Sequence, residues 1–124
     1  MSDPMNKSTD STLIAASKVE GKSVYDTAGE KIGTVKELYI DKASGEVEFA
    51  ALSCGGMLGV GEKYHPLPWS ALDYDTDKDG FVVDVDKQQL EASPAYEQER
   101  LSSSDHGWGA EVRRYYDNPN PAHV

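Results

Sequence analysis

The stretch from Asp75 to Asp86, DTDKDGFVVDVD, carries acidic residues at the spacing of a calcium-binding loop. Such a loop places carboxylates at alternate positions to supply oxygen ligands, with a glycine at the sixth position for a sharp turn. Here Gly80 is the sixth residue, and the first, third, fifth and twelfth residues are Asp75, Asp77, Asp79 and Asp86. These four aspartates therefore form a candidate calcium site.

Two features of the same stretch favour an ordinary turn. The twelfth residue is Asp86, whose side chain is one methylene shorter than the glutamate that binds calcium through both oxygens. The preceding WSALDY is too short for an entering helix, and the following FVVDV has the composition of a strand. We expect an Asp- and Gly-rich connection between two strands, with calcium binding as the alternative.

The glycine-rich stretch CGGMLGVGEKYHPLPW, residues 54–69, resembles a phosphate-binding loop only in its glycines. A phosphate loop needs a lysine directly after the last glycine and then a helix whose N-terminus faces the phosphates. Here Glu62 follows the last glycine, and Pro66 and Pro68 are too close together for a continuous helix. We therefore predict no phosphate site and expect the glycines to permit tight turns.

Other residues that could perform catalysis are few and scattered. The histidines are His65, His106 and His123. No pair of them has the sequence spacing that would let it bind a metal ion together with Cys54. Cys54 has no basic neighbour in the sequence that would lower its thiol pKa, and no G-x-S-x-G nucleophile motif occurs. We predict a protein that is not an enzyme, with no catalytic residues and no cofactor apart from the calcium alternative.

One cluster combines basic and aromatic residues, in the segment AEVRRYYD of residues 110–117. Its helical pattern allows two interpretations: a helix packed on the rest of the chain, or a docking surface for another protein. With the tryptophan just before it, the cluster defines the candidate partner-binding residues Trp108, Arg113, Arg114, Tyr115 and Tyr116.

The elements that would position these residues are mainly short strands. Turn signals rich in Gly and Asp separate the expected strands, which are residues 23–25, 32–40, 47–52, 63–67 and 81–85. Within residues 32–40 the apolar positions break strict alternation, which predicts a bulge or strong curvature. Five or six strands in a chain of this length indicate a closed or nearly closed barrel.

Short helices are expected after the strands. Asp86 and Gln89 have the spacing of a capping box, Pro94 is suited to the start of a helix over residues 95–101, and a third helix covers residues 110–117. Residues 1–12 are polar and are expected to be disordered.

The chain carries an ordered series of glycine, apolar and Pro-Trp positions, which consists of Gly21, Val24, Gly29, Ile32, Gly33, Ile40, Asp41, Gly45, Gly55, Gly56, Gly59, Gly61, Pro68 and Trp69. This series resembles the PRC-barrel family, which includes the cytoplasmic part of the bacterial photosynthetic reaction-centre H subunit and the C-terminal domain of the ribosome-maturation factor. The resemblance covers residues 13–96 and leaves 97–124 as a helical or irregular extension. It implies a small β-barrel of about six strands with short C-terminal helices, a non-catalytic role in contacting a partner macromolecule, and a free-standing bacterial member.

The charge balance narrows the class of partner. The chain of 124 residues has 22 acidic and 12 basic side chains, a net charge of −10, which disfavours binding to nucleic acid or to an anionic membrane. No apolar run reaches the roughly 20 residues of a membrane span, the N-terminus lacks the apolar core of a signal peptide, and a single cysteine cannot form an intrachain disulfide. We expect a cytoplasmic protein with an unidentified protein partner, with a homodimer as one form of that interaction.

Overall fold

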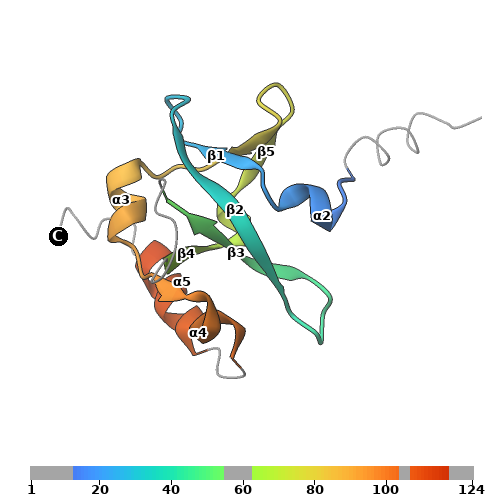
Figure 1. Ribbon diagram of the computed structural model, residues 1–124, viewed down its shortest axis with the longest axis vertical. Coiled ribbons are helices and arrows are strands. Elements are labelled where there is room, and N and C mark those ends of the chain that lie inside the picture. Colours follow the sequence, from blue (N-terminus) through green and yellow to red (C-terminus); the bar gives the residue numbers. More distant parts are fainter. Residues whose placement is uncertain (1–12, 55–62, 104–106, 118–124) are drawn as a thin grey trace, which may run out of the picture.

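The computed structural model describes residues 13–54, 63–103 and 107–117, which form a twisted sheet with short helices beside it (Figure 1). The strands are β1 (Ser23–Tyr25), β2 (Lys31–Ile40), β3 (Val47–Ser53), β4 (Lys63–Pro68), β5 (Asp73–Asp75), β6 (Gly80–Val82) and β7 (Tyr96–Glu97). Their order across the sheet is β5-β6-β1-β2-β3-β4-β7. Neighbouring strands are antiparallel except β1 and β6, which are parallel.

The helices lie on two sides of the sheet. They are α2 (Ala16–Val19), the 3₁₀ turn η1 (Trp69–Ala71), α3 (Lys87–Ala92), α4 (Gln98–Ser102) and α5 (Trp108–Asp117). Figure 1 shows α3, α4 and α5 together on one side, whereas α2 lies across the sheet from them. No helix of the described residues is both long and apolar enough to cross a membrane.

Strand β2 is irregular, as the spacing of its apolar residues predicts. Its register with β3 shifts between Val35 and Glu37 and again between Tyr39 and Ile40. An extra residue in one strand of an antiparallel pair bends that strand and increases its twist. The predicted bulge in residues 32–40 is confirmed.

Local side-chain hydrogen bonds form the turns on either side of β2. The carboxylates of Asp26 and Asp41 each accept a hydrogen bond from the backbone N–H two residues later, at 3.0 and 2.8 Å. Gly29 and Gly45 complete these turns with φ values of 89° and 80°, a conformation that favours glycine. Aspartate and glycine thus set the geometry of both turns.

Strand β3 is buried on both faces, and it separates two hydrophobic clusters. Successive side chains of a strand point to opposite faces, so Ala50 and Leu52 enter one cluster while Phe49 and Ala51 enter the other. The first cluster contains Val19, Val24, Ile32, Val35, Ala50, Leu52, Leu67, Leu72, Phe81, Val83 and Leu90. The second cluster contains Phe49, Ala51, Leu101, Trp108 and Val112, so α4 and α5 cover that face of the sheet.

Several element boundaries differ from the expectations. The sheet has seven strands rather than about six. Among the described residues its two edge strands, β5 and β7, do not pair with each other, so closure of a barrel is not confirmed. The expected strand of residues 81–85 is shorter, because only Gly80–Val82 form the ladder with β5. The helix expected over residues 95–101 begins only at Gln98, because Tyr96 and Glu97 pair with β4.

Other boundaries are closer to the sequence predictions. The last helix begins at Trp108, two residues earlier than expected. The capping box of α3 is confirmed: the Asp86 carboxylate accepts from the backbone N–H of Gln89 at 2.8 Å, and Gln89 Oε1 accepts from that of Asp86 at 3.0 Å. The expectations for the tail of residues 1–12, the glycines of residues 55–62, His106 and His123 concern positions outside the described residues.

Candidate functional site

The candidate partner-binding residues lie on α5, and Trp108 is buried inside the protein. Its side chain is 2% exposed, and its ring lies 5.3 Å from the ring of Tyr39 and 5.1 Å from that of Phe49, measured between centroids. Aromatic pairs at such distances and at tilted angles attract each other, and this attraction adds to the stabilisation gained from burying the rings. Trp108 therefore anchors the start of α5 to β2 and β3.

Arg113 also contacts the chain's own sheet. Its guanidinium carbon lies 4.6 Å from the centroid of the Phe49 ring, and the group forms an ion pair with Glu48. A guanidinium over an aromatic face is attracted by the ring's negative electrostatic potential. Arg113 thus holds α5 against the start of β3.

The remaining three candidate residues differ in exposure. The Tyr115 hydroxyl donates to the carbonyl oxygen of Gln89 at 2.8 Å, which ties α5 to α3. Tyr116 is half-buried against both clusters, and burial raises the pKa of its hydroxyl. Arg114 is exposed. These contacts favour the interpretation that α5 packs on its own sheet, while the docking role remains a prediction.

The predicted calcium site includes the turn between β5 and β6. The Asp75 carboxylate accepts from the backbone N–H groups of Asp77 and Lys78, at 2.9 and 3.3 Å. Asp79, at a φ of 51°, accepts from the Lys22 ammonium at 2.6 Å and from the Tyr74 hydroxyl. The hydrogen bond from Lys22 lowers the pKa of Asp79. The turn is therefore held by its own backbone and by a cation from the segment before β1.

The fourth predicted ligand belongs to a different element. Asp86 caps the N-terminus of α3, where its carboxylate accepts from the backbone N–H of Gln89. In the described part of the chain, no group of three or more His, Cys, Asp or Glu side chains is arranged to hold a metal ion. Calcium binding by these aspartates stays a prediction.

The described histidine lies within β4, and the cysteine directly follows β3. His65 of β4 is buried, and its Nδ1 lies 3.0 Å from the Ser93 hydroxyl oxygen. Since that hydroxyl donates to the Leu90 carbonyl oxygen at 2.6 Å, Nδ1 carries the hydrogen and donates to Ser93. Burial lowers the pKa of His65 and raises that of Cys54 to about 11, so this thiol is a poor nucleophile at neutral pH.

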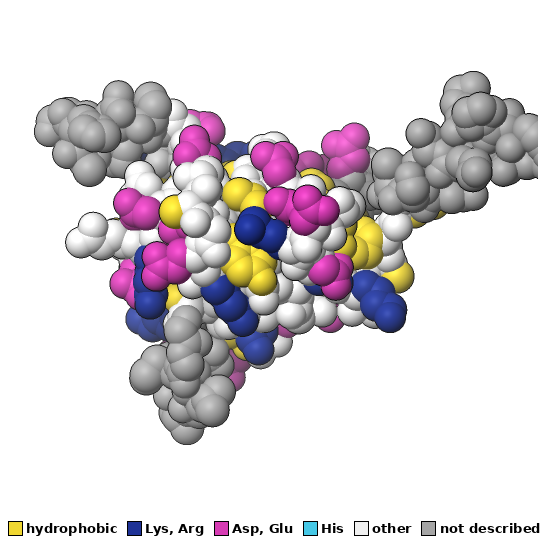
Figure 2. Space-filling view, turned by 90° about the horizontal axis from the view of Figure 1, so that it is seen from above, with side chains coloured by type: hydrophobic (Ala, Val, Ile, Leu, Met, Phe, Trp, Pro, Cys, Tyr) yellow, Lys and Arg dark blue, Asp and Glu magenta, His cyan; other side chains and the backbone are white. Residues whose placement is uncertain are grey.

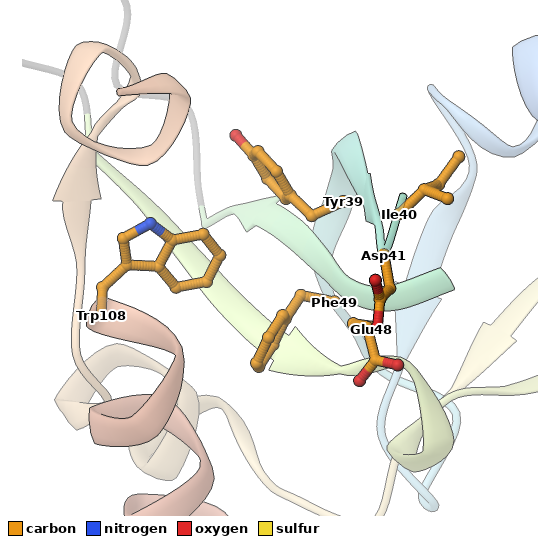
Figure 3. A pocket seen from close by; sticks show the side chains of 6 residues that line it. All are labelled: Tyr39, Ile40, Asp41, Glu48, Phe49 and Trp108. Atoms are coloured by element: carbon orange, nitrogen blue, oxygen red, sulfur yellow. The ribbon is translucent and has the colours of Figure 1, made fainter. Parts of the chain in front are cut away.

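A small pocket, which we call the aromatic pocket, opens where the end of β2 meets β3 and the start of α5 (Figure 3). Its volume is about 170 Å³, and it is lined by Tyr39, Ile40, Asp41, Glu48, Phe49 and Trp108. In Figure 3 the three aromatic rings lie on one side and the two carboxylates on the other. Aromatic and acidic groups are thus combined around one opening.

A larger groove lies beside α2. We call it the α2 groove; its volume is about 650 Å³, and its lining includes Leu13, Ile14, Trp69, Tyr74 and Phe81 together with charged side chains. Lys22 and Asp79 of this lining form an ion pair, and Lys18 is exposed. Figure 2 shows, on the face seen from above, hydrophobic side chains at the surface among lysines and carboxylates.

Sequence reasoning missed both concave sites for different reasons. The α2 groove has a weak signal in the sequence: Leu13 and Ile14 are an apolar pair directly after a polar tail. The aromatic pocket combines Tyr39, Phe49 and Trp108, which only long-range packing brings together. Of its residues, only Trp108 is among the predicted partner-binding residues.

A comparison with protein families agrees with this architecture. The family model of the PRC-barrel domain matches residues 11–90, which is more than half of the chain. The match includes strands β1 to β6, whereas β7, α4 and α5 follow it. No curated protein matches the sequence. The resemblance expected from the glycine and Pro-Trp positions is therefore confirmed, and the chain belongs to the PRC-barrel domain family.

Proposed function

We propose that this protein is a non-catalytic interaction module that binds another protein through its concave apolar surfaces. One observation carries the proposal: the exposed large hydrophobic side chains of the described residues all line the two concave sites. Leu13, Ile14 and Tyr74 are 72%, 42% and 41% exposed in the α2 groove, and Ile40 is 53% exposed at the aromatic pocket. Large apolar side chains exposed together in a concave site are typical of interaction sites.

The charge of the chain supports a protein as the partner. A net charge of −10 repels nucleic acid and anionic membranes, and it disfavours pairing of two identical acidic surfaces. We infer a cytoplasmic adaptor role with a different protein as the main partner, and a homodimer as the alternative. We also infer that the sheet approaches a closed barrel, as the family resemblance implies.

Affinity capture from the native cell tests the proposal. We expect the full-length chain to retrieve a partner that the Leu13→Ser/Ile14→Ser double variant loses, because truncating an apolar anchor weakens binding about fivefold or more. The control is an Ala28→Ser/Ala43→Ser double variant, whose two positions are exposed and do not line the groove. All three proteins should unfold at the same temperature.

The opposite result would contradict the proposal. If the full-length chain retrieves no protein that the groove variant loses, the α2 groove does not bind a partner. If the chain in addition sediments as a monomer at every concentration, the interaction role itself has no support.

A further inference from the structure

We propose that the aromatic pocket binds a cationic side chain, lysine or arginine, of the partner protein. This inference rests on the proposed function, because it names the chemistry of one contact within that interaction. Four features support it: the aromatic walls, the carboxylates beside them, a cation of the chain itself on one wall, and the size of the pocket.

The walls of the pocket are suited to a cation. Tyr39 and Phe49 are paired across β2 and β3, and Trp108 packs against both rings from α5. Aromatic rings attract cations over their faces, and recognition of cations by several rings together is a recurrent use of this attraction. Aliphatic parts of a lysine or arginine stem also pack well on such rings.

The two carboxylates of the pocket leave a negative charge for a ligand. Glu48 is paired with Arg113, whereas Asp41 has no ion pair with a described cation. One oxygen of Asp41 accepts from the backbone N–H of Ala43 at 2.8 Å, which orients the carboxylate without neutralising it. Asp41 is exposed and is therefore available to a partner's ammonium or guanidinium group.

Arg113, which does not line the pocket, is a cation that contacts two of the residues lining it. Its guanidinium lies over Phe49 and pairs with Glu48, so one wall and one carboxylate already bind a positive group of the same chain. The pocket is lined by the other two rings and by Asp41 as well. A second cation from a partner would repeat this combination of ring and carboxylate contacts.

The size of the pocket limits what it can hold. A volume of about 170 Å³ is below the roughly 300 Å³ at which small-molecule sites begin. One long side chain fits this space better than a cofactor. Ile40, which points away from the rings in Figure 3, offers an apolar contact for a residue next to the cation. The net charge of −10 also attracts a basic partner.

Nuclear magnetic resonance titration of the full chain tests the proposal with n-butylammonium, which is the lysine side chain itself. The Trp108 indole N–H resonance reports on the aromatic pocket, and that of Trp69, which lines the α2 groove, is an internal reference. We expect n-butylammonium to shift the Trp108 resonance in a saturable way. The uncharged 1-butanol and the anion butyrate, which have similar carbon chains, should shift it much less.

A pair of variants locates the charge effect. Asp41→Asn keeps the oxygen that accepts from Ala43 but removes the charge, and we expect it to weaken n-butylammonium binding about twofold to fivefold, the range of an exposed ion pair. Asp84→Asn makes the same charge change at an exposed residue that does not line the pocket, and should leave binding unchanged.

Three results would overturn the inference: 1-butanol shifting Trp108 as strongly as n-butylammonium, equal shifts of Trp69 and Trp108, or equal weakening by Asp41→Asn and Asp84→Asn. Each would leave the proposed function standing, because that function is tested separately by the groove variant in affinity capture. If the groove variant loses partner binding while the titration is negative, the proposed function is supported and the inference about the aromatic pocket is contradicted.

Discussion

His65 is held in the interior of the domain with its imidazole in the neutral form. Its Nδ1–H donates to the Ser93 hydroxyl, which in turn donates to the end of α3, so the histidine joins β4 to α3. Burial lowers the pKa of His65 below its ordinary value of 6.5, while the nearby charge of Glu91 acts in the opposite direction. A proton on this ring would place a charge where the surroundings favour a neutral group.

This arrangement predicts a loss of stability in mildly acidic solution. Between the lowered pKa of the folded state and about 6.5, the unfolded chain binds a proton at His65 that the folded chain does not. The contribution of His65 is therefore fully present above about pH 6.5 and decreases as the pH falls through that window. Urea unfolding at about pH 7.5 and about pH 5 measures the change.

The matched variant is His65→Gln, whose amide keeps hydrogen-bonding groups for Ser93 but does not titrate. We expect the free energy of unfolding of this variant to fall less between the two pH values than that of the natural chain. Equal losses in both proteins would assign the pH dependence to other groups.

A second prediction at the scale of single residues concerns calcium binding at Asp79. Its carboxylate accepts from the Lys22 ammonium at 2.6 Å, so a calcium ion bound there would have to displace a lysine. We expect millimolar calcium to leave the temperature of unfolding unchanged, because a ligand that does not bind the native state does not stabilise it. A saturable rise in that temperature, absent from an Asp75→Asn variant, would instead establish the calcium alternative.

At the scale of elements, α4 and α5 act as part of the core rather than as an appendage. Leu101 of α4 is fully buried in the second cluster with Trp108 and Val112 of α5. Covering this face of β3 explains why the sequence AAL within that strand is apolar at successive positions, since a strand buried on both faces loses its alternation.

We therefore predict that Leu101→Ala lowers the free energy of unfolding by about 2–5 kcal/mol, the usual cost of removing buried methyl groups. The control is Leu13→Ala, because Leu13 is 72% exposed and its replacement should change stability by no more than about 0.5 kcal/mol. Urea denaturation followed by circular dichroism measures both. An unchanged free energy in Leu101→Ala would show that α4 and α5 contribute little to the fold.

The elements also show what the sequence could predict. The capping box of Asp86 and Gln89 and the bulge in β2 depend on residues close together in the chain, and both were predictable from type and spacing. The short strand β7 was not, because Tyr96 and Glu97 follow a proline and acquire their extended form by pairing with β4. Tertiary contacts there outweigh the local preference for a helix.

At the scale of the whole molecule, the candidate sites were also predictable only where they depend on residues close together in the chain. The basic and aromatic residues of α5 were recognisable as a cluster, but the sequence could not tell that Trp108 would be buried against Tyr39 and Phe49. Residues 39, 49 and 108 meet only after the sheet and α5 have packed together. Composition alone gives the sign of the net charge, on which the proposed class of partner rests, but not the place of contact.

The parallel pair of β1 and β6 has a consequence for how the chain is made. Val24 of β1 is aligned with Phe81 of β6, so β1 leaves the ribosome well before the strand that completes its ladder. Until then one edge of β1 has unpaired N–H and C=O groups, which can pair with another nascent chain. Closing so long a loop is entropically costly and slows folding relative to local pairing. We therefore expect the edge of β1 to stay open to such pairing until β6 has been synthesised.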